Sequence, residues 1–430
     1  MIHKKLTPEQ QHTGMRNAIR TQAFGVMGQI CFRSGLLLLY LKVLDFSSPA
    51  VITCLSLPFL IAGVMTIPGA YIADLYGRKN IGYSGQTLQL TGFILLALTG
   101  FAGSQTVIYF CAVSGVALFS IGDALMGSSW FGLMKPVVPA NMRGRFWARL
   151  RFCWQTLGLI FSGTCAAFLD KDSSVRVFQF IFSLVALSHF IRIFFYRRIP
   201  EEEQPVRKGG FFVTVVHILR SPGYASFCCY IFLLYLTVHG APAIFALIEK
   251  EVIAFGDNQV VWLGNFLMTG NVLGFLFVGR IVDRFGTRVI FLICHLTFGL
   301  VMAFFLFRAH VPVNMFAYIS ILSLLFGAAV SSSSVAVTTE MMSLAPEENQ
   351  ALGTSICITL LKTGMGLSGL IGATALYLGI LAEKWTFLGQ ELSRYDTILL
   401  ISAFAVVVLT VTLGLVPSVL GKSYEGPSTQ

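Results

Sequence analysis

Long apolar runs constrain this chain more than any other feature of its sequence. Residues 47–73, for example, contain no charged side chain. A helix needs about 20 apolar residues to cross a hydrocarbon core roughly 30 Å thick. Because lipid offers no hydrogen-bond partner to an open backbone, only helices or a closed barrel can span it. The runs are continuously apolar and do not alternate as barrel strands do, so they predict transmembrane helices.

The composition agrees with a membrane protein. Of the 430 residues, 55% are hydrophobic and only 12% are charged, whereas soluble proteins carry roughly 25% charged residues. We therefore predict an all-α polytopic membrane protein whose surroundings are the lipid bilayer. The prediction comprises twelve transmembrane helices, at residues 18–43, 47–73, 80–103, 106–134, 142–169, 174–196, 222–248, 257–281, 287–308, 312–341, 350–381 and 394–418.

The net charge of +10 is explained by membrane topology. Most Lys and Arg residues fall at the termini and in every second connection between the predicted spans, as Arg78, Lys79, Arg197 and Arg198 do. Basic residues concentrate on the cytoplasmic side of membrane proteins, so we expect both termini in the cytoplasm and no nucleic-acid partner. The N-terminus lacks the short apolar core of a cleaved signal peptide. We expect a multi-pass protein of the plasma membrane, specifically a bacterial inner membrane.

The sequence contains an internal repeat. The stretch ADLYGRKN includes Asp74 and the stretch VDRFGTRV includes Asp283, 209 residues later. A second pair, Pro139 and Pro346, precedes a long apolar run in each case and is separated by 207 residues. Two matches at nearly the same offset predict a duplicated unit, an arrangement known in transporters.

The repeat also sets the predicted domain boundaries. The segment RRIPEEEQPVRKGG, which begins at Arg197, is the longest polar stretch in the middle of the chain. Six predicted spans precede it and six follow. We therefore assign residues 1–196 to an N-terminal six-helix bundle, 197–221 to a cytoplasmic linker and 222–430 to a C-terminal six-helix bundle, the two bundles being pseudo-symmetric.

Together these features resemble the major facilitator superfamily (MFS) of secondary transporters. The segment GRIVDRFGTR, from Gly279 to Arg288, follows the Gly-x-x-x-Asp-Arg-x-Gly-x-Lys/Arg signature of that family. The first copy departs from it, since Ala70 replaces the leading glycine and Leu75 replaces the arginine. The resemblance covers essentially the whole chain. It implies the fold and an alternating-access mechanism, and it says little about the substrate.

The repeated motif is a candidate cytoplasmic gate. Its tight turn needs a residue that accepts a positive φ, which Gly77 and Gly286 provide. An acid at a helix N-terminus gains about 0.3–2 kcal/mol, and the resemblance implies that Asp74 meets the start of span 11 and Asp283 the start of span 5 in the closed state. The alternative is that these charged loops only support topology. The gate prediction comprises Asp74, Gly77, Arg78, Asp283, Arg284, Gly286, Arg288 and Glu340.

Ionisable side chains inside spans are costly, rare and usually functional. Arg33 in span 1 and Asp123 in span 4 lie in spans that line the central cavity in the family, so we expect them to face each other, either as cavity residues or as a structural ion pair. His239 in span 7 is a candidate proton site, with a satisfied buried histidine as the alternative. Lys362 in span 11 corresponds to a polar residue of span 5. The substrate and coupling candidates are Arg33, Asp123, Gln155, His239 and Lys362.

The expected function is secondary active transport of a small organic solute by alternating access, coupled to protons as in a symporter. Two basic mid-span residues against one acidic residue favour an anionic or strongly hydrogen-bonding solute. A multidrug–proton antiporter is the alternative, but span 4 lacks an Arg before Gly122 and span 5 lacks the family's proline. A transporter-like sensor is a further alternative. No catalytic motif or nucleotide-binding loop is present, so we expect no enzyme, no cofactor, no metal and a monomer.

Overall fold

The computed structural model describes residues 6–139, 143–202, 211–311, 314–344, 350–387 and 389–414. Within these ranges the side chains are described except at residues 74, 143–145, 148, 211–214, 279–280, 282–285, 309, 350–352 and 413–414. The chain divides into two compact units, unit 1 from Met1 to Gly209 and unit 2 from Gly210 to Gln430.

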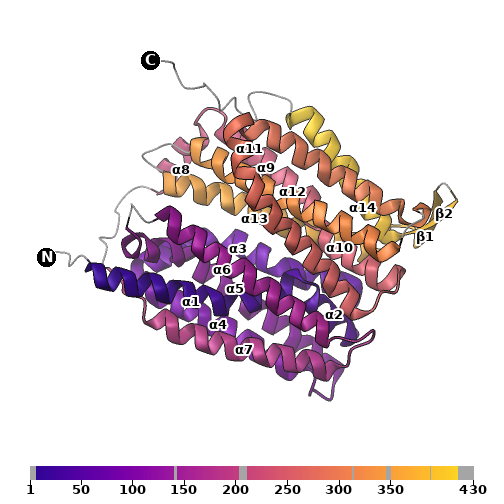
Figure 1. Cartoon of the computed structure of the whole chain (residues 1–430), viewed down its shortest axis with the longest axis horizontal. Coiled ribbons are helices and arrows are strands. Elements are labelled where there is room, and N and C mark those ends of the chain that lie inside the picture. The colour runs from indigo at the N-terminus through magenta and orange to yellow at the C-terminus, as the bar shows by residue number, and fades with distance from the viewer. Residues whose placement is uncertain are drawn as a thin grey trace. The chain divides into compact units, whose positions relative to one another are not determined.

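Unit 1 is a bundle of helices, drawn from indigo to magenta in Figure 1. Neighbouring helices pack along most of their length, α4 against α5 and α7, and α1 against α6 and α7. Glycines allow the closest approach, because a Cβ on Gly85 would lie 2.6 Å from the carbonyl oxygen of Gly122. The elements are α1 (Pro8–Arg33), α2 (Leu36–Val43), α3 (Ser48–Tyr76), α4 (Arg78–Thr99), α5 (Gln105–Val137), α6 (Arg143–Phe168) and α7 (Val175–Arg197).

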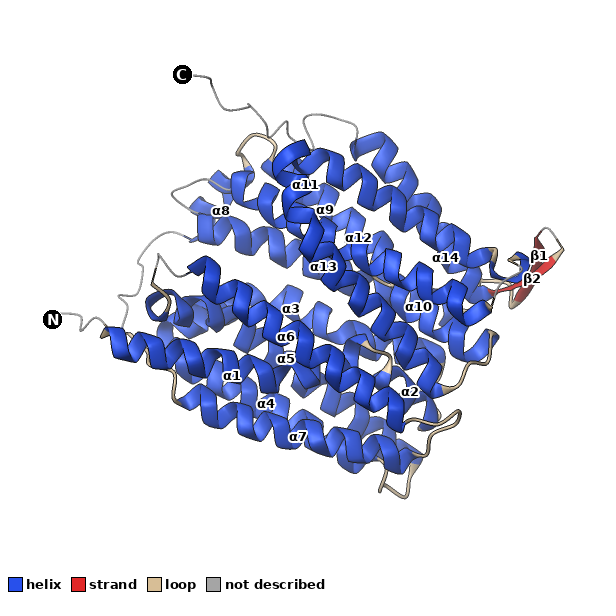
Figure 2. Cartoon of the chain, viewed as in Figure 1, coloured by secondary structure: helices blue, strands red, loops and turns tan. Residues whose placement is uncertain are grey.

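Unit 2 is also helical but carries a β-hairpin between its last two long helices (Figure 2). The strands β1 (Lys384–Phe387) and β2 (Gln390–Ser393) pair antiparallel, and Gly389 at the tip has a φ of 77°. The helical elements are α8 (Phe211–Leu219), α9 (Tyr224–Val238), α10 (Ala241–Leu247), the π-helical turn η2 (Ile248–Val252), α11 (Asp257–Leu306), the 3-10 turn η3 (Arg308–His310), α12 (Met315–Leu344), α13 (Gln350–Tyr377), α14 (Arg394–Leu409) and the π-helical turn η5 (Thr410–Gly414).

The helices have the dimensions of membrane spans. Within the part of the chain that the structure describes, nine segments are long and apolar enough to cross a membrane, and α1 with α2 makes a tenth when the bent pair is taken as one span. Two helices that we predicted as spans, α4 and α6, are not among them. Gln86 and Gln89 make α4 polar, and Arg149 and Arg151 do the same for α6. A multi-pass helical membrane protein is therefore supported, whereas the count of twelve spans is not confirmed.

The two motif turns adopt the backbone conformation that the sequence predicts. Gly77, between α3 and α4, has a φ of 92°, and Gly286, inside α11, has a φ of 77°. Positive φ is readily available to glycine and costly for most other residues. The Gly286 turn divides α11 into two spans, Asp257–Val278 and Gly286–Leu306, so both copies of the motif end one span and begin the next.

The first span of each unit is interrupted. In unit 1, α1 and α2 meet at an angle of 56°, and Gly35 at the break has a φ of 82°. In unit 2, α9 ends at Val238 and α10 begins at Ala241, because Pro242 has no N–H for the carbonyl of Val238. The breaks fall at nearly corresponding positions of the repeat, since Gly35 precedes Gly240 by 205 residues and Pro139 precedes Pro346 by 207.

Candidate functional site

A hydrogen-bonded network surrounds Asp123 in the middle of α5. Oδ1 of Asp123 accepts hydrogen bonds from Nε2 of Gln29 on α1 at 2.5 Å and from Nε2 of Gln89 on α4 at 3.1 Å. Oε1 of Gln89 in turn accepts a hydrogen bond from Nη1 of Arg192 on α7. Gln89 and Arg192 are buried and Asp123 is half-buried. Four helices thus converge on one carboxylate, with a buried positive charge behind it.

Arg192 and Gln89 are absent from the sequence predictions. Arg192 is 4% exposed, and its neighbourhood depends on a close helix approach, because a Cβ on Gly25 would lie 2.5 Å from Nε of Arg192. An arginine inside the apolar run of α7 could have marked Arg192 as a site residue, because a charged side chain inside a span rarely lacks a partner. The partner itself was not predictable, because it lies 103 residues away on another helix.

Arg33 and Asp123 do not form the direct pair that one of our alternatives required. Among the described residues no hydrogen bond or ion pair joins them. Arg33 ends α1 and is exposed, and its guanidinium lies over the ring of Trp154 on α6, 5.4 Å from the ring centroid. A cation at this distance from an indole face is stabilised electrostatically. Trp154 is thus a third residue at the site that sequence reasoning missed.

The other substrate candidates lie in both units. Gln155 is half-buried on α6 of unit 1, and Lys362 is half-buried on α13 of unit 2. His239 lies directly at the break between α9 and α10, where its ring is 6.4 Å from that of Tyr235. His239 and Lys362 both make contacts within the protein. The roles of these three residues remain predictions.

Unit 2 has its own buried polar cluster, centred on His295. Nδ1 of His295 lies 2.6 Å from the hydroxyl of Tyr230, and Nε2 lies 3.1 Å from the hydroxyl of Ser333. Both ring nitrogens therefore have hydroxyl partners, and His295 is fully buried. This arrangement explains how an apolar core accommodates a histidine, because each buried polar atom is satisfied.

The structure describes only some of the residues of the predicted cytoplasmic gate. Arg78 donates from Nη1 to the carbonyl oxygen of Gly132 at 3.1 Å, and the hydroxyl of Thr287 donates to Oε2 of the buried Glu340 at 2.6 Å. Arg288 is half-buried and makes contacts within the protein. The side chains of Asp74, Asp283 and Arg284 lie outside the described residues, so their gating contacts remain predictions.

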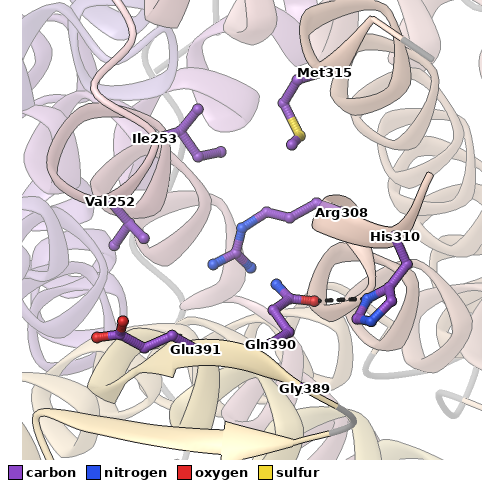
Figure 3. Close-up of a pocket in the computed structure, with 8 residues that line it drawn as sticks. All are labelled: Val252, Ile253, Arg308, His310, Met315, Gly389, Gln390 and Glu391. Carbon is purple, nitrogen blue, oxygen red and sulfur yellow. Dashed lines mark hydrogen bonds between the residues drawn. The ribbon is translucent and has the colours of Figure 1, made fainter. Parts of the chain in front are cut away.

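Unit 2 also contains a cavity of about 490 Å³ beside the β-hairpin (Figure 3). The guanidinium of Arg308 lies in it, but Asp396 holds that group with two hydrogen bonds of 2.5 and 3.0 Å. Glu391 forms an ion pair with Lys384 and raises the pKa of this exposed lysine. The ionic groups named here already have partners. The full lining is Val252, Ile253, Arg308, His310, Met315, Gly389, Gln390 and Glu391.

Comparison with known proteins identifies the family. The family model described as Major Facilitator Superfamily matches residues 21–365. The chain belongs to this superfamily. No curated protein sequence matches it closely enough to count as a relative.

Solved structures of MFS-type transporters share the fold. A nucleoside transporter, NupG, superposes with a TM-score of 0.68 at 12% identity, covering 93% of this chain and 98% of that one. A POT family transporter in complex with 5-aminolevulinic acid gives a TM-score of 0.71 at 14% identity, with coverages of 95% and 96%. A bacterial homologue of the iron transporter ferroportin, in its inward-facing state, gives 0.67 at 13% identity, with coverages of 95% and 98%. At these identities the likeness shows the fold alone, and the family indicates a transporter, not an enzyme.

Proposed function

We propose that this MFS protein is a proton-coupled secondary transporter that moves a small organic solute by alternating access. The proposal places both termini in the cytoplasm and the protein in a bacterial inner membrane, where it acts as a monomer. The solved transporters with the same fold carry chemically different cargo by their titles, including nucleosides and peptides. The substrate must therefore be inferred from the residues of this chain.

The main support for this proposal is the interruption in the first span of each unit. The breaks at Gly35 and Gly240 fall within two residues of corresponding positions of the repeat. One of our substrate candidates lies near each break, Arg33 and His239. In transporters built from repeats, helices interrupted at corresponding positions mark the substrate and ion sites. Polar backbone and ionisable side chains inside a membrane occur mainly where they line a cavity or make contacts within the protein.

Asp123 is our candidate for the coupling proton. It is half-buried, lies in the middle of a span and is held by two amide donors. A carboxylate so placed changes the local charge by one unit when it takes up a proton. In this proposal that change alters the free-energy difference between inward-open and outward-open states, because the Asp123 network joins four helices of unit 1.

Transport by purified protein in sealed proteoliposomes tests this function. Solutes are screened for uptake driven by an imposed proton gradient and, separately, for exchange without a gradient. We expect gradient-driven uptake, and we expect Asp123→Asn to lose the response of uptake to the gradient. Uptake that does not depend on the gradient would show that transport is not coupled to protons. Solute binding without uptake or exchange favours the sensor, and export of unrelated aromatic cations favours the multidrug antiporter.

The cytoplasmic latch formed by Asp74 and Asp283 is the second part of the proposal. Each motif turn has the positive φ that the latch geometry needs, at Gly77 and Gly286. A latch of about 0.3–2 kcal/mol per contact suits a transporter, since a stronger contact would hold one state. Asp283→Asn should increase the labelling rate of single cysteines placed on the cytoplasmic face. An unchanged labelling rate in a folded variant contradicts the latch.

A further inference from the structure

We propose that Arg33, Trp154 and Asp123 form a solute site on unit 1 for a small organic acid that also carries a hydroxyl or amino group. The acid group lies at Arg33 and the hydrogen-bond donor at Asp123. This inference rests on the proposed transport function and names the chemical class of its substrate.

Arg33 supplies a positive charge that forms no ion pair among the described residues. It is exposed, and its guanidinium lies over the ring of Trp154. A charged side chain inside a span normally faces a polar space and has a counter-charge. Because no acidic side chain that the structure describes forms an ion pair with Arg33, an anionic group of a solute is the chemically matched partner. The guanidinium fork is suited to a carboxylate or phosphate, which it binds through two parallel hydrogen bonds.

The carboxylate of Asp123 is a hydrogen-bond acceptor, and its negative charge is balanced by the buried Arg192. Both amide donors, from Gln29 and Gln89, bind Oδ1, and no hydrogen bond to Oδ2 is present within the described residues. Arg192 lies behind Gln89 and acts electrostatically on Asp123. Of the three charges of Arg33, Asp123 and Arg192, that of Arg33 is then the one without an opposite charge to balance it. Oδ2 of Asp123 remains free to accept a hydrogen bond from a hydroxyl or amino group.

The spacing of the two groups determines the size of the solute. Gln29 and Arg33 are four residues apart on α1 and therefore lie on one face of that helix, about 6 Å apart along its axis. Because Gln29 holds Asp123, we infer that the carboxylate and the guanidinium lie on the same side of α1, on the order of one helical turn apart. They act on each other electrostatically without bonding directly. A donor and an acid group separated by a few covalent bonds can bridge them, with the carbon chain against Trp154.

A matched four-carbon series tests the assignment. Binding of γ-aminobutyrate, γ-hydroxybutyrate, butyrate and butylamine to the full-length protein in lipid nanodiscs is measured by calorimetry. We expect the amino and hydroxy acids to bind at least about tenfold more tightly than butyrate, because butyrate has no hydrogen-bond donor for Asp123. Butylamine has no acid group for Arg33 and should not bind. Arg33→Gln should abolish binding of all three acids, and Arg33→Lys should restore part of it. Asp123→Ala should bring the amino and hydroxy acids down to the affinity of butyrate.

Arg20 offers the matched control. It is exposed, lies on the same helix and places its guanidinium 5.2 Å from the ring centroid of Phe195, but it is not part of the Asp123 network. Arg20→Gln should leave every affinity unchanged, so a loss common to both glutamine variants would overturn the site.

The inference also fails if no acid of the series binds, or if Arg33→Gln binds the acids normally. Proton-driven uptake only of solutes that carry no acid group would overturn it while the transport function stands. Absence of uptake and exchange for every solute would instead overturn the transport function.

Discussion

Glu201 accepts a hydrogen bond at Oε1 from the backbone N–H of Lys79, at 2.9 Å, two residues beyond the turn at Gly77. The carboxylate follows α7 and lies at the N-terminus of α4, where unpaired N–H groups and the helix dipole favour a negative charge. Unit 2 has a related contact, between Thr287 and Glu340, one residue beyond the turn at Gly286. In both units an acid of the same unit therefore holds the helix that follows the motif turn.

Removing the Glu201 carboxylate should loosen the first turn of α4. We expect Glu201→Ala to cost about 0.5–2 kcal/mol, the usual value of a helix cap. Hydrogen exchange of the Lys79 region, followed by mass spectrometry, should accelerate in the variant. Glu202→Ala is the control, because Glu202 makes no recorded contact with α4. Equal exchange rates in the two variants would show that Glu201 does not cap this helix.

Thr287→Val should destabilise unit 2 by about 1–3 kcal/mol, because the buried Glu340 loses a hydrogen bond. The measurement is the thermal unfolding midpoint in detergent. Thr297→Val makes the same change on the same helix, but the Thr297 hydroxyl is exposed and bonds only to the carbonyl oxygen of Ile293. The Thr297 variant should unfold close to the parent temperature, and a similar drop in both variants would contradict the role of Glu340.

The close approach of α4 and α5 predicts a sharp difference between two glycines of α5. A Cβ on Gly122 would lie 2.3 Å from the carbonyl oxygen of Gly85, whereas a Cβ on Gly127 meets nothing within 4 Å. Gly122→Ala should cost about 1–3 kcal/mol, since backbone must shift to accept the methyl group. Gly127→Ala should leave the unfolding midpoint unchanged or slightly raised, because alanine favours a helix. Tolerance of Gly122→Ala would mean that the helices pack less closely than described.

Two ion pairs near the hairpin should differ in their effect on stability. Arg308 and Asp396 are 4% and 0% exposed, and removing one member of a buried pair typically costs about 3–5 kcal/mol. We therefore expect Asp396→Asn to lower the unfolding midpoint strongly. Glu391→Gln breaks the exposed pair with Lys384 and should have no measurable effect in moderate salt, where surface pairs are screened. A large loss in the Glu391 variant would indicate that the hairpin depends on its surface charges.

Arg192 and Gln89 should show strong coupling in a double-mutant cycle. Gln89→Leu removes the hydrogen-bond partner of a buried guanidinium, and Arg192→Met removes the charge itself. We expect the double variant to lose less stability than the two single variants together, because Gln89→Leu no longer deprives a buried guanidinium of its partner once Arg192 is gone. Additive losses in the two single variants would show that the arginine is stabilised by other groups.

The sequence predicted those features that depend on local chemistry. The apolar runs predicted membrane helices, and the turns at Gly77 and Gly286 adopt positive φ because the motif demands it. The partners of buried polar groups were not predictable, because they lie far apart along the chain. Asp123 was expected opposite Arg33, but it is held by Gln29 and Gln89.

Two further residues illustrate the same limit. Trp130 is 5% exposed within an apolar cluster with Met126, Leu133 and Phe146, and its own stretch of sequence does not indicate which residues surround it. His295 lies in an apolar run and bonds to hydroxyls of two other helices, which come from distant parts of the chain. Tertiary packing decides such environments, and a single sequence contains little information about it.

The β-hairpin of unit 2 has a practical consequence for imaging this 47.1 kDa protein. Its base is fixed, because Oδ2 of Asp396 accepts hydrogen bonds from the backbone N–H and the hydroxyl of Ser393, both at 2.8 Å. Lys384, Thr386 and Glu391 are exposed on the strands and offer an epitope. An antibody fragment raised against them would be held at a constant angle, and it would give cryo-electron microscopy the alignment marker that small membrane proteins need.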